Sequence, residues 1–89
     1  MAALAPAVFN RKIRLMVAED VITPDVGTMA NALHRNVNAD LDVIVHAARI
    51  LVDKEILPHV VRTNYAIGGV TFDVVREALA QARAEIEAE

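Results

Sequence analysis

The segment DLDVIVHAARILVDKEIL, residues 40–57, decides the fold because apolar residues surround most of the helix that it would form. With about 100° of rotation per residue, the apolar residues fall on two adjoining faces and leave only a narrow polar stripe. The first face is Leu41, Ile44, Val45, Ala48, Leu51 and Val52, and the second is Val43, Ala47 and Ile50. A helix with two apolar faces packs against more than one neighbour. The segment therefore predicts the central helix of a small all-α bundle of four or five helices.

A first helix is predicted over residues 7–19. Its core face is Phe9, Ile13, Met16 and Val17, with Val8 and Leu15 on an adjoining strip. The same segment carries the basic residues Arg11, Lys12 and Arg14. These three residues fit either a solvated surface or a patch that docks an acidic partner.

A second helix should begin at Pro24. Thr23 is a favourable N-cap, proline suits the first helical position, and Asp25 favours the positive end of the helix dipole. The core face of this helix is Val26, Met29, Leu33 and Val37. Gly27 lies inside the helix and costs about 1 kcal/mol relative to alanine. We therefore expect Gly27 to permit the close approach of another backbone.

Residues 58–69, PHVVRTNYAIGG, permit two structures. Pro58 is expected to end the central helix at about Leu57, because the residue before a proline avoids helical geometry. A short helix is favoured by Pro58 in the first position and by Gly68 as a stop. A strand and hairpin is favoured by the β-branched Val60 and Val61 and by the Gly-Gly pair. The short helix is the preferred prediction.

A last helix is predicted from Thr71, which acts as its N-cap. The apolar residues that follow repeat at steps of three and four, as in the seam of a coiled coil. This seam is Phe72, Val75, Leu79, Ala82 and Ile86. We interpret these five residues as the candidate interface with a second copy or with a partner protein. Packing within the chain would use the same residues.

Length and composition limit the possible functions. The 89 residues are enough for a single helical domain, residues 1–89, and 55% of them are hydrophobic. A domain of this size buries only about 60% of the surface of its unfolded chain. We therefore expect a second copy, related by a twofold axis, or a partner protein to cover part of the apolar surface. The chain contains neither cysteine nor serine, which excludes nucleophiles and zinc sites built on these residues.

Charge and hydrophobic runs limit the partners. The net charge is −3, so nucleic acid is not an expected partner because it would repel the chain. The apolar runs are shorter than the about 18 residues of a membrane span, and the N-terminal residues lack the basic region of a secretory signal. A soluble cytoplasmic protein that contacts no membrane is expected.

The polar stripe of the central helix is Asp42, His46, Arg49 and Asp53. Asp42 and His46 are four residues apart, so they could bind a metal ion or transfer a proton together with Asp53. However, the helix lacks a second histidine at ligand spacing, and Asp-His and Arg-Asp pairs within one helix explain the same residues. We therefore assign no catalytic residue, no metal ligand and no cofactor.

Together these observations favour a non-enzymatic helical module for protein–protein interaction or assembly, either a homo-oligomer or an accessory subunit of a larger complex. One alternative is a small transcriptional-regulator module, because the second and central helices have a helix-turn-helix-like layout. Asp40 and Asp42 at the start of the central helix oppose DNA contact. The other alternative is a small enzyme that uses Asp42, His46 and Asp53. A basic surface would favour the regulator, and a pocket around His46 would favour the enzyme.

Overall fold

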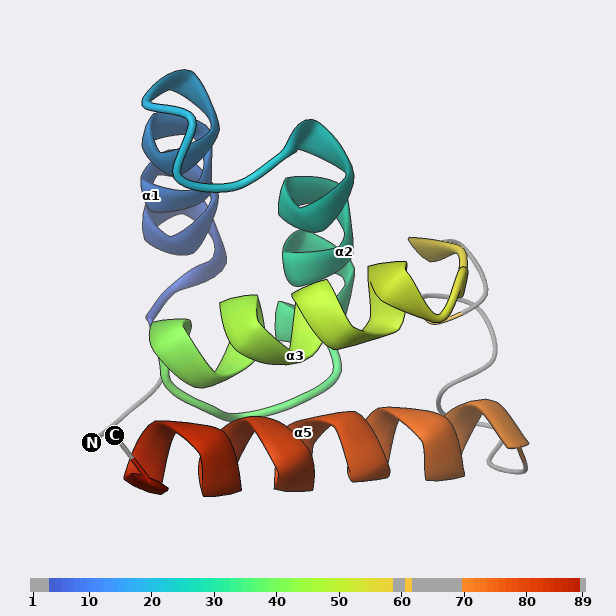
Figure 1. Cartoon of the computed structure of the whole chain (residues 1–89). Coiled ribbons are helices and arrows are strands. Elements are labelled where there is room, and N and C mark those ends of the chain that lie inside the picture. Colours follow the sequence, from blue (N-terminus) through green and yellow to red (C-terminus); the bar gives the residue numbers. More distant parts are fainter. Residues whose placement is uncertain (1–3, 59–60, 62–69, 89) are drawn as a thin grey trace.

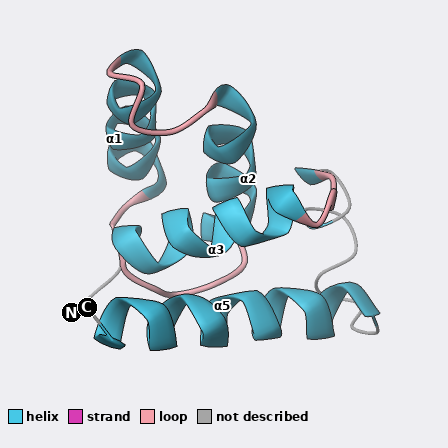
Figure 2. Cartoon of the chain, in the orientation of Figure 1, coloured by secondary structure: helices cyan, strands magenta, loops and turns pink. Residues whose placement is uncertain are grey.

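The computed structural model describes residues 4–58, residue 61 and residues 70–88. Within these residues the chain forms four helices, α1 (Pro6–Ala18), α2 (Pro24–His34), α3 (Leu41–Asp53) and α5 (Val70–Ala88) (Figure 1). Figure 2 shows only helices and loops in the same residues. The prediction of a small all-α bundle is confirmed. None of the described helices is long and apolar enough to span a membrane.

α3 is the centre of the bundle. It packs against both α2 and α5, while α1 packs against α2. In Figure 1, α1 and α2 stand side by side and run transverse to α3 and α5, which run along each other. Ile44, Ala48 and Leu51 of α3 are fully buried. The prediction that the apolar segment contacts more than one helix is therefore confirmed.

The start of α2 is built as the sequence predicts, but the environment of Gly27 is not. The Oγ1 of Thr23 accepts a hydrogen bond from the N–H of Val26 at 3.3 Å, so Thr23 is the N-cap. A Cβ atom on Gly27 would lie 3.0 Å from Cγ2 of Val17 and 3.2 Å from Cγ2 of Ile13. Both of these residues belong to α1. The close approach is therefore made by side chains of α1 and not, as predicted, by another backbone.

α3 ends four residues before the predicted limit at residue 57. It ends at Asp53, and Glu55 then adopts a left-handed backbone with a φ angle of 63°. The N–H of Glu55 donates to the Val52 carbonyl at 2.9 Å, and the N–H of Ile56 donates to the Leu51 carbonyl at 3.1 Å. These two hydrogen bonds define a Schellman motif, which usually has glycine at the left-handed position. The glutamate there explains why the sequence pattern placed the helix end too late.

α1 ends in the same motif. Asp20 has a φ angle of 58°, and its N–H donates to the Val17 carbonyl at 3.1 Å. The N–H of Val21 donates to the Met16 carbonyl at 2.9 Å. The bounds of α1, residues 6–18, differ from the predicted ones by one residue at each end. A left-handed backbone costs a residue with a side chain about 1–2 kcal/mol, so both helix ends carry local strain.

α5 begins at Val70, one residue before the predicted cap. The helix therefore starts one residue earlier than predicted, and the side chain of Thr71, on which the predicted cap depends, lies outside the described residues. Residues 59–60 and 62–69, on which most of the choice between helix and hairpin depends, lie outside the described residues. Pro58 and Val61 are helical, and the N–H of Val61 donates to the Leu57 carbonyl at 3.4 Å.

One cluster of apolar side chains forms the core and receives residues from every described helix. Its largest fully buried members are Phe9, Ile13, Met29, Leu33, Ile44, Leu51, Val61 and Val75. Among the described residues, no polar or charged side chain is buried with them. Apolar burial, at about 25 cal/mol per Å², therefore holds the helices together, and the polar contacts lie around the edge of this core.

Candidate interaction surfaces

The seam that the sequence predicts as an interface lies against the core of its own chain. Val75 and Ala82 are fully buried, Leu79 is 6% exposed and Ile86 is half-buried. The side chain of Phe72 lies outside the described residues. The buried side chains of this seam leave little area for a partner to cover, and the exposed apolar residues lie on other faces of the molecule.

His46 pairs with α5 and not with a residue of its own helix. Its Nε2–H donates to Oε1 of Glu85 at 3.1 Å, and both side chains are partly exposed. Hydrogen bonds from His46 and from Gln81 hold the pKa of the Glu85 carboxyl below its ordinary value of 4.5. This pair ties the middle of α3 to the last turns of α5.

Arg49 also bonds to a distant part of the chain. Its Nη2–H donates to the Val21 carbonyl at 3.0 Å, which ties α3 to the turn after α1. Oδ1 of Asp42 accepts from the N–H of Val43 at 2.9 Å. The predicted Asp-His and Arg-Asp pairs within the helix are therefore wrong. The actual partners of His46 and Arg49 come from segments that a single-helix pattern does not contain.

The polar stripe of α3 does not gather into one site. His46 bonds to α5, Asp42 contacts the backbone of its own helix, and Asp53 lines a hollow near the end of α3. Within the described residues, no group of three or more histidine, aspartate or glutamate side chains is placed to hold a metal ion. The stripe therefore serves as a set of separate contacts between helices and loops.

The exposed side of α1 combines apolar residues with cations. Val8 is 37% exposed and Leu15 is 57% exposed, and a spacing of seven residues places them about two turns apart on the same side. Arg11, Lys12 and Arg14 are exposed beside them. In the described part of the chain, none of these three cations takes part in an ion pair. We call these five residues the outer face of α1.

A groove lies between the start of α2 and the end of α3. It consists of two neighbouring hollows of about 560 and 300 Å³, and Asp25 and Val52 line both of them. Its lining includes the buried Ile22 and Val26 and four apolar residues that are half-buried or exposed, Val21, Val52, Ile56 and Leu57, which we call its floor. Val21 is 52% exposed and Leu57 is 55% exposed, so this floor remains open to solvent.

Four residues with carboxylates also line this groove. They are Asp20, Asp25, Asp53 and Glu55, which are all exposed. Arg49 is the basic residue among the described residues that line the groove, and its guanidinium is hydrogen-bonded to the Val21 carbonyl. The left-handed turns that end α1 and α3 place Asp20 and Glu55 in this rim. We call the floor and its four carboxylates the acid-rimmed groove.

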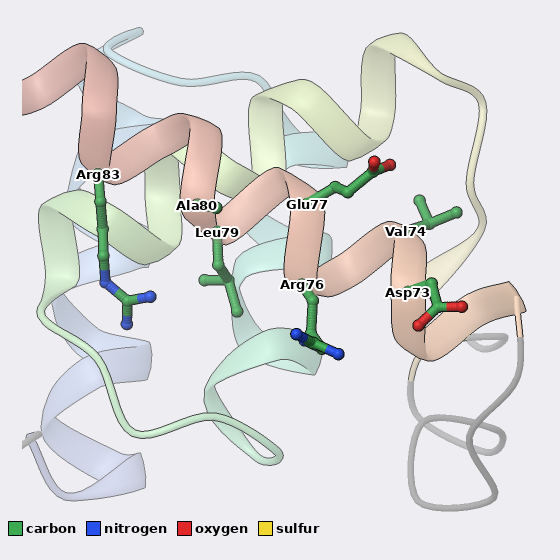
Figure 3. Close-up of a pocket in the computed structure, with 7 residues that line it drawn as sticks. All are labelled: Asp73, Val74, Arg76, Glu77, Leu79, Ala80 and Arg83. Atoms are coloured by element: carbon green, nitrogen blue, oxygen red, sulfur yellow. The ribbon is translucent and has the colours of Figure 1, made fainter.

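A third hollow, of about 680 Å³, lies along α5. Figure 3 shows Arg76, Leu79 and Arg83 pointing to one side of the helix and Glu77 pointing to the other. Asp73 also lines this hollow. Charges of both signs therefore surround it, and it does not select a partner of either sign.

A polar hollow of about 440 Å³ lies between α1 and α2, and Asn10, Asn31, His34 and Arg35 contribute to its lining. The Nδ2–H of Asn31 donates to Oδ1 of Asn10 at 3.2 Å. The His34 ring stacks on Phe9, with ring centroids 4.0 Å apart. Sequence reasoning missed both contacts because the paired residues are far apart in the chain. Their effect is to hold α1 against α2.

Comparison with known proteins identifies a family but no function. Residues 1–83 match the model of a family described as Family of unknown function (DUF7185), so the chain belongs to that family. No curated protein and no solved structure matches the chain.

Proposed function

We propose that this member of the family is a non-enzymatic helical module that self-associates. The observation that carries the proposal is the position of the large exposed apolar side chains. Single ones are common on protein surfaces. Among the described residues, however, Val8 and Leu15 lie on the outer face of α1, and Val21 and Leu57 lie in the acid-rimmed groove. Each pair is surrounded by charges of one predominant sign, and the two signs are opposite.

The small size of the chain supports association. Leu15 and Leu57 remain more than half exposed although the core receives residues from every described helix. Covering such side chains yields about 25 cal/mol per Å² of apolar area. Association with another protein surface is a direct way to obtain this free energy.

An enzymatic function has weaker support. The chemistry would need Asp42, His46 and Asp53 to converge on a substrate. Instead, His46 is hydrogen-bonded to Glu85, and Asp42 contacts the backbone of Val43. Because these groups serve separate contacts, a shared proton-transfer role is not favoured.

Transcriptional regulation also has weaker support. A helix-turn-helix protein presents basic or amide groups of its second helix to base edges. α3 follows α2 in that order, but Asp42 lies in its first turn and Arg49 is bonded to a backbone carbonyl. The acid-rimmed groove would in addition repel DNA phosphates. The basic outer face of α1 belongs to a different helix from the one that would read bases in this layout, so a protein partner is the better match to these surfaces.

Sedimentation equilibrium of the purified chain, from low to high micromolar concentration, tests the proposal. We expect the average mass to rise with concentration above that of the 9.7 kDa monomer. A chain that remains monomeric throughout, and that binds no dye for exposed apolar surface, would contradict self-association. A titration into labelled duplex DNA at about 150 mM salt is the parallel measurement. Salt-sensitive, submicromolar binding there would favour the regulator instead.

A further inference from the structure

We infer that the contact between copies is made by the outer face of α1 of one copy docked in the acid-rimmed groove of the other. This inference rests on the proposed self-association and adds the residues that meet. It is carried by charge complementarity between two surfaces that both expose apolar side chains.

The groove presents carboxylates that have no cation partner within the described chain. Asp20, Asp25, Asp53 and Glu55 are exposed and take part in no ion pair there. The guanidinium of Arg49, which lines the same groove, donates to a backbone carbonyl. A cationic surface that covers the groove would therefore meet carboxylates that are still available.

The outer face of α1 has the matching composition. Val8 and Leu15 are separated by about 10 Å along the helix, and Arg11 and Lys12 lie between them in the sequence. Long basic side chains can lie along apolar surface and extend their charged ends beyond it. With Val8 and Leu15 on the floor of the groove, Arg11 and Lys12 can therefore reach the carboxylates of the rim.

Other pairings of these surfaces fit less well. Two outer faces of α1 would bring cations together, and two acid-rimmed grooves would bring carboxylates together, so both pairings are repulsive. The hollow on α5 carries both signs of charge and discriminates little. Only the pairing of α1 with the groove, among these surfaces of the described chain, joins opposite charges while it covers apolar side chains on both sides.

Because the two surfaces differ, the contact is isologous if two copies make it twice across a twofold axis, and heterologous if each copy docks on the next. Two copies can make it reciprocally, or each copy can dock on the next in a series. In both arrangements every copy provides one outer face and one groove. A variant that loses one surface therefore keeps the other, and mixing two different variants can recover the contact.

Cysteine cross-linking tests which residues meet, because the chain has no cysteine of its own. Leu15→Cys and Leu57→Cys are prepared as separate chains, and both positions are exposed enough for substitution without loss of the core. A disulfide requires Cα atoms within about 7 Å. The two chains are mixed in equal amounts under mild oxidation. We expect the disulfide-linked dimer that joins one chain of each kind to form several-fold faster than the linked dimers of two identical chains. The control mixture combines Leu15→Cys with Ala84→Cys, which is exposed on α5.

Charge reversal tests the electrostatic part. One double variant carries Arg11→Glu and Lys12→Glu, and the other carries Asp53→Lys and Glu55→Lys. Each should raise the dissociation constant of self-association by about tenfold or more. Their equimolar mixture should restore association, because each reversed surface then meets its opposite.

The control variant, Glu77→Lys with Glu87→Lys, makes the same change in net charge as the groove variant at exposed positions of α5. Circular dichroism checks that all variants remain helical.

Two results would overturn the inference in different ways. A wild-type chain that associates, with unchanged dissociation constants in both double variants and no preference for the mixed cross-link, removes the assigned contact and leaves self-association standing. A wild-type chain that stays monomeric removes the proposed function as well.

Discussion

α1 and α5 both pack on the α2–α3 pair, but they use their apolar residues differently. α5 directs its seam inward, and Val75 and Ala82 of that seam are fully buried. α1 buries Phe9 but leaves Val8 and Leu15 exposed between cations. Apolar residues on the core side of an amphipathic helix are therefore used for folding. Apolar residues off that side, next to unpaired charges, are the better candidates for contact with another molecule.

The largest expected difference between the two helices is in the cost of removing a leucine. Leu79→Ala on α5 should lower the free energy of unfolding by about 2–5 kcal/mol, because it leaves a cavity in the core. Leu15→Ala on α1 should change it by no more than about 0.5 kcal/mol when the chain is dilute. Urea denaturation followed by circular dichroism measures both. Equal losses in the two variants would mean that α1 and α5 do not differ as described.

The contact of α1 with α2 can be tested at Gly27. Gly27→Val should lower the free energy of unfolding by about 1–3 kcal/mol, because its side chain would displace Val17 and Ile13 of α1. Thr28→Val, at the neighbouring exposed position, is the matched control and should have a small effect. If both variants are equally stable, then α1 does not pack on Gly27 as tightly as the structure indicates.

The left-handed helix ends should respond to glycine with a gain in stability. Glu55→Gly is expected to raise the free energy of unfolding by about 1 kcal/mol, because glycine adopts a positive φ angle without the steric penalty. Glu55→Ala is the control, since it removes the carboxylate but keeps the strain. Asp20→Gly tests the equivalent position after α1. Loss of stability in both glycine variants, measured by urea denaturation, would argue that the carboxylates and not the backbone decide these helix ends.

The smallest effect is expected at the pair that ties α5 to α3. Because the pKa of Glu85 is lowered in the folded chain, the pair contributes stability above the ordinary glutamate pKa of 4.5. That contribution is lost as the pH falls below 4.5 through the lowered folded-state value. Glu85→Gln should remove this part of the pH dependence and change stability little near neutral pH, because the pair is exposed to solvent. Melting curves between pH 3 and pH 7 compare the variant with the wild type, and identical pH profiles would show that the pair has no energetic role.

Local sequence signals predicted most of the helices. Thr23 before Pro24 placed the start of α2 correctly, because a cap depends only on neighbouring residues. The end of α3 was missed because Glu55 occupies a position where glycine is usual. The candidate interface on α5 was identified by periodicity alone. Periodicity shows which side of a helix is apolar but does not show whether the same chain or another one covers it.

The sequence by itself determined the all-α class, the approximate positions of the helices, their core-facing sides and the central place of the segment that forms α3. These properties depend on residues within a few turns of one another, so their pattern is visible in the chain. Only the tertiary structure decided that His46 bonds to Glu85, that Arg49 bonds to the turn after α1, and that four carboxylates line one groove. The reason is physical: these groups come from separate segments, and their distances are set by how the helices pack.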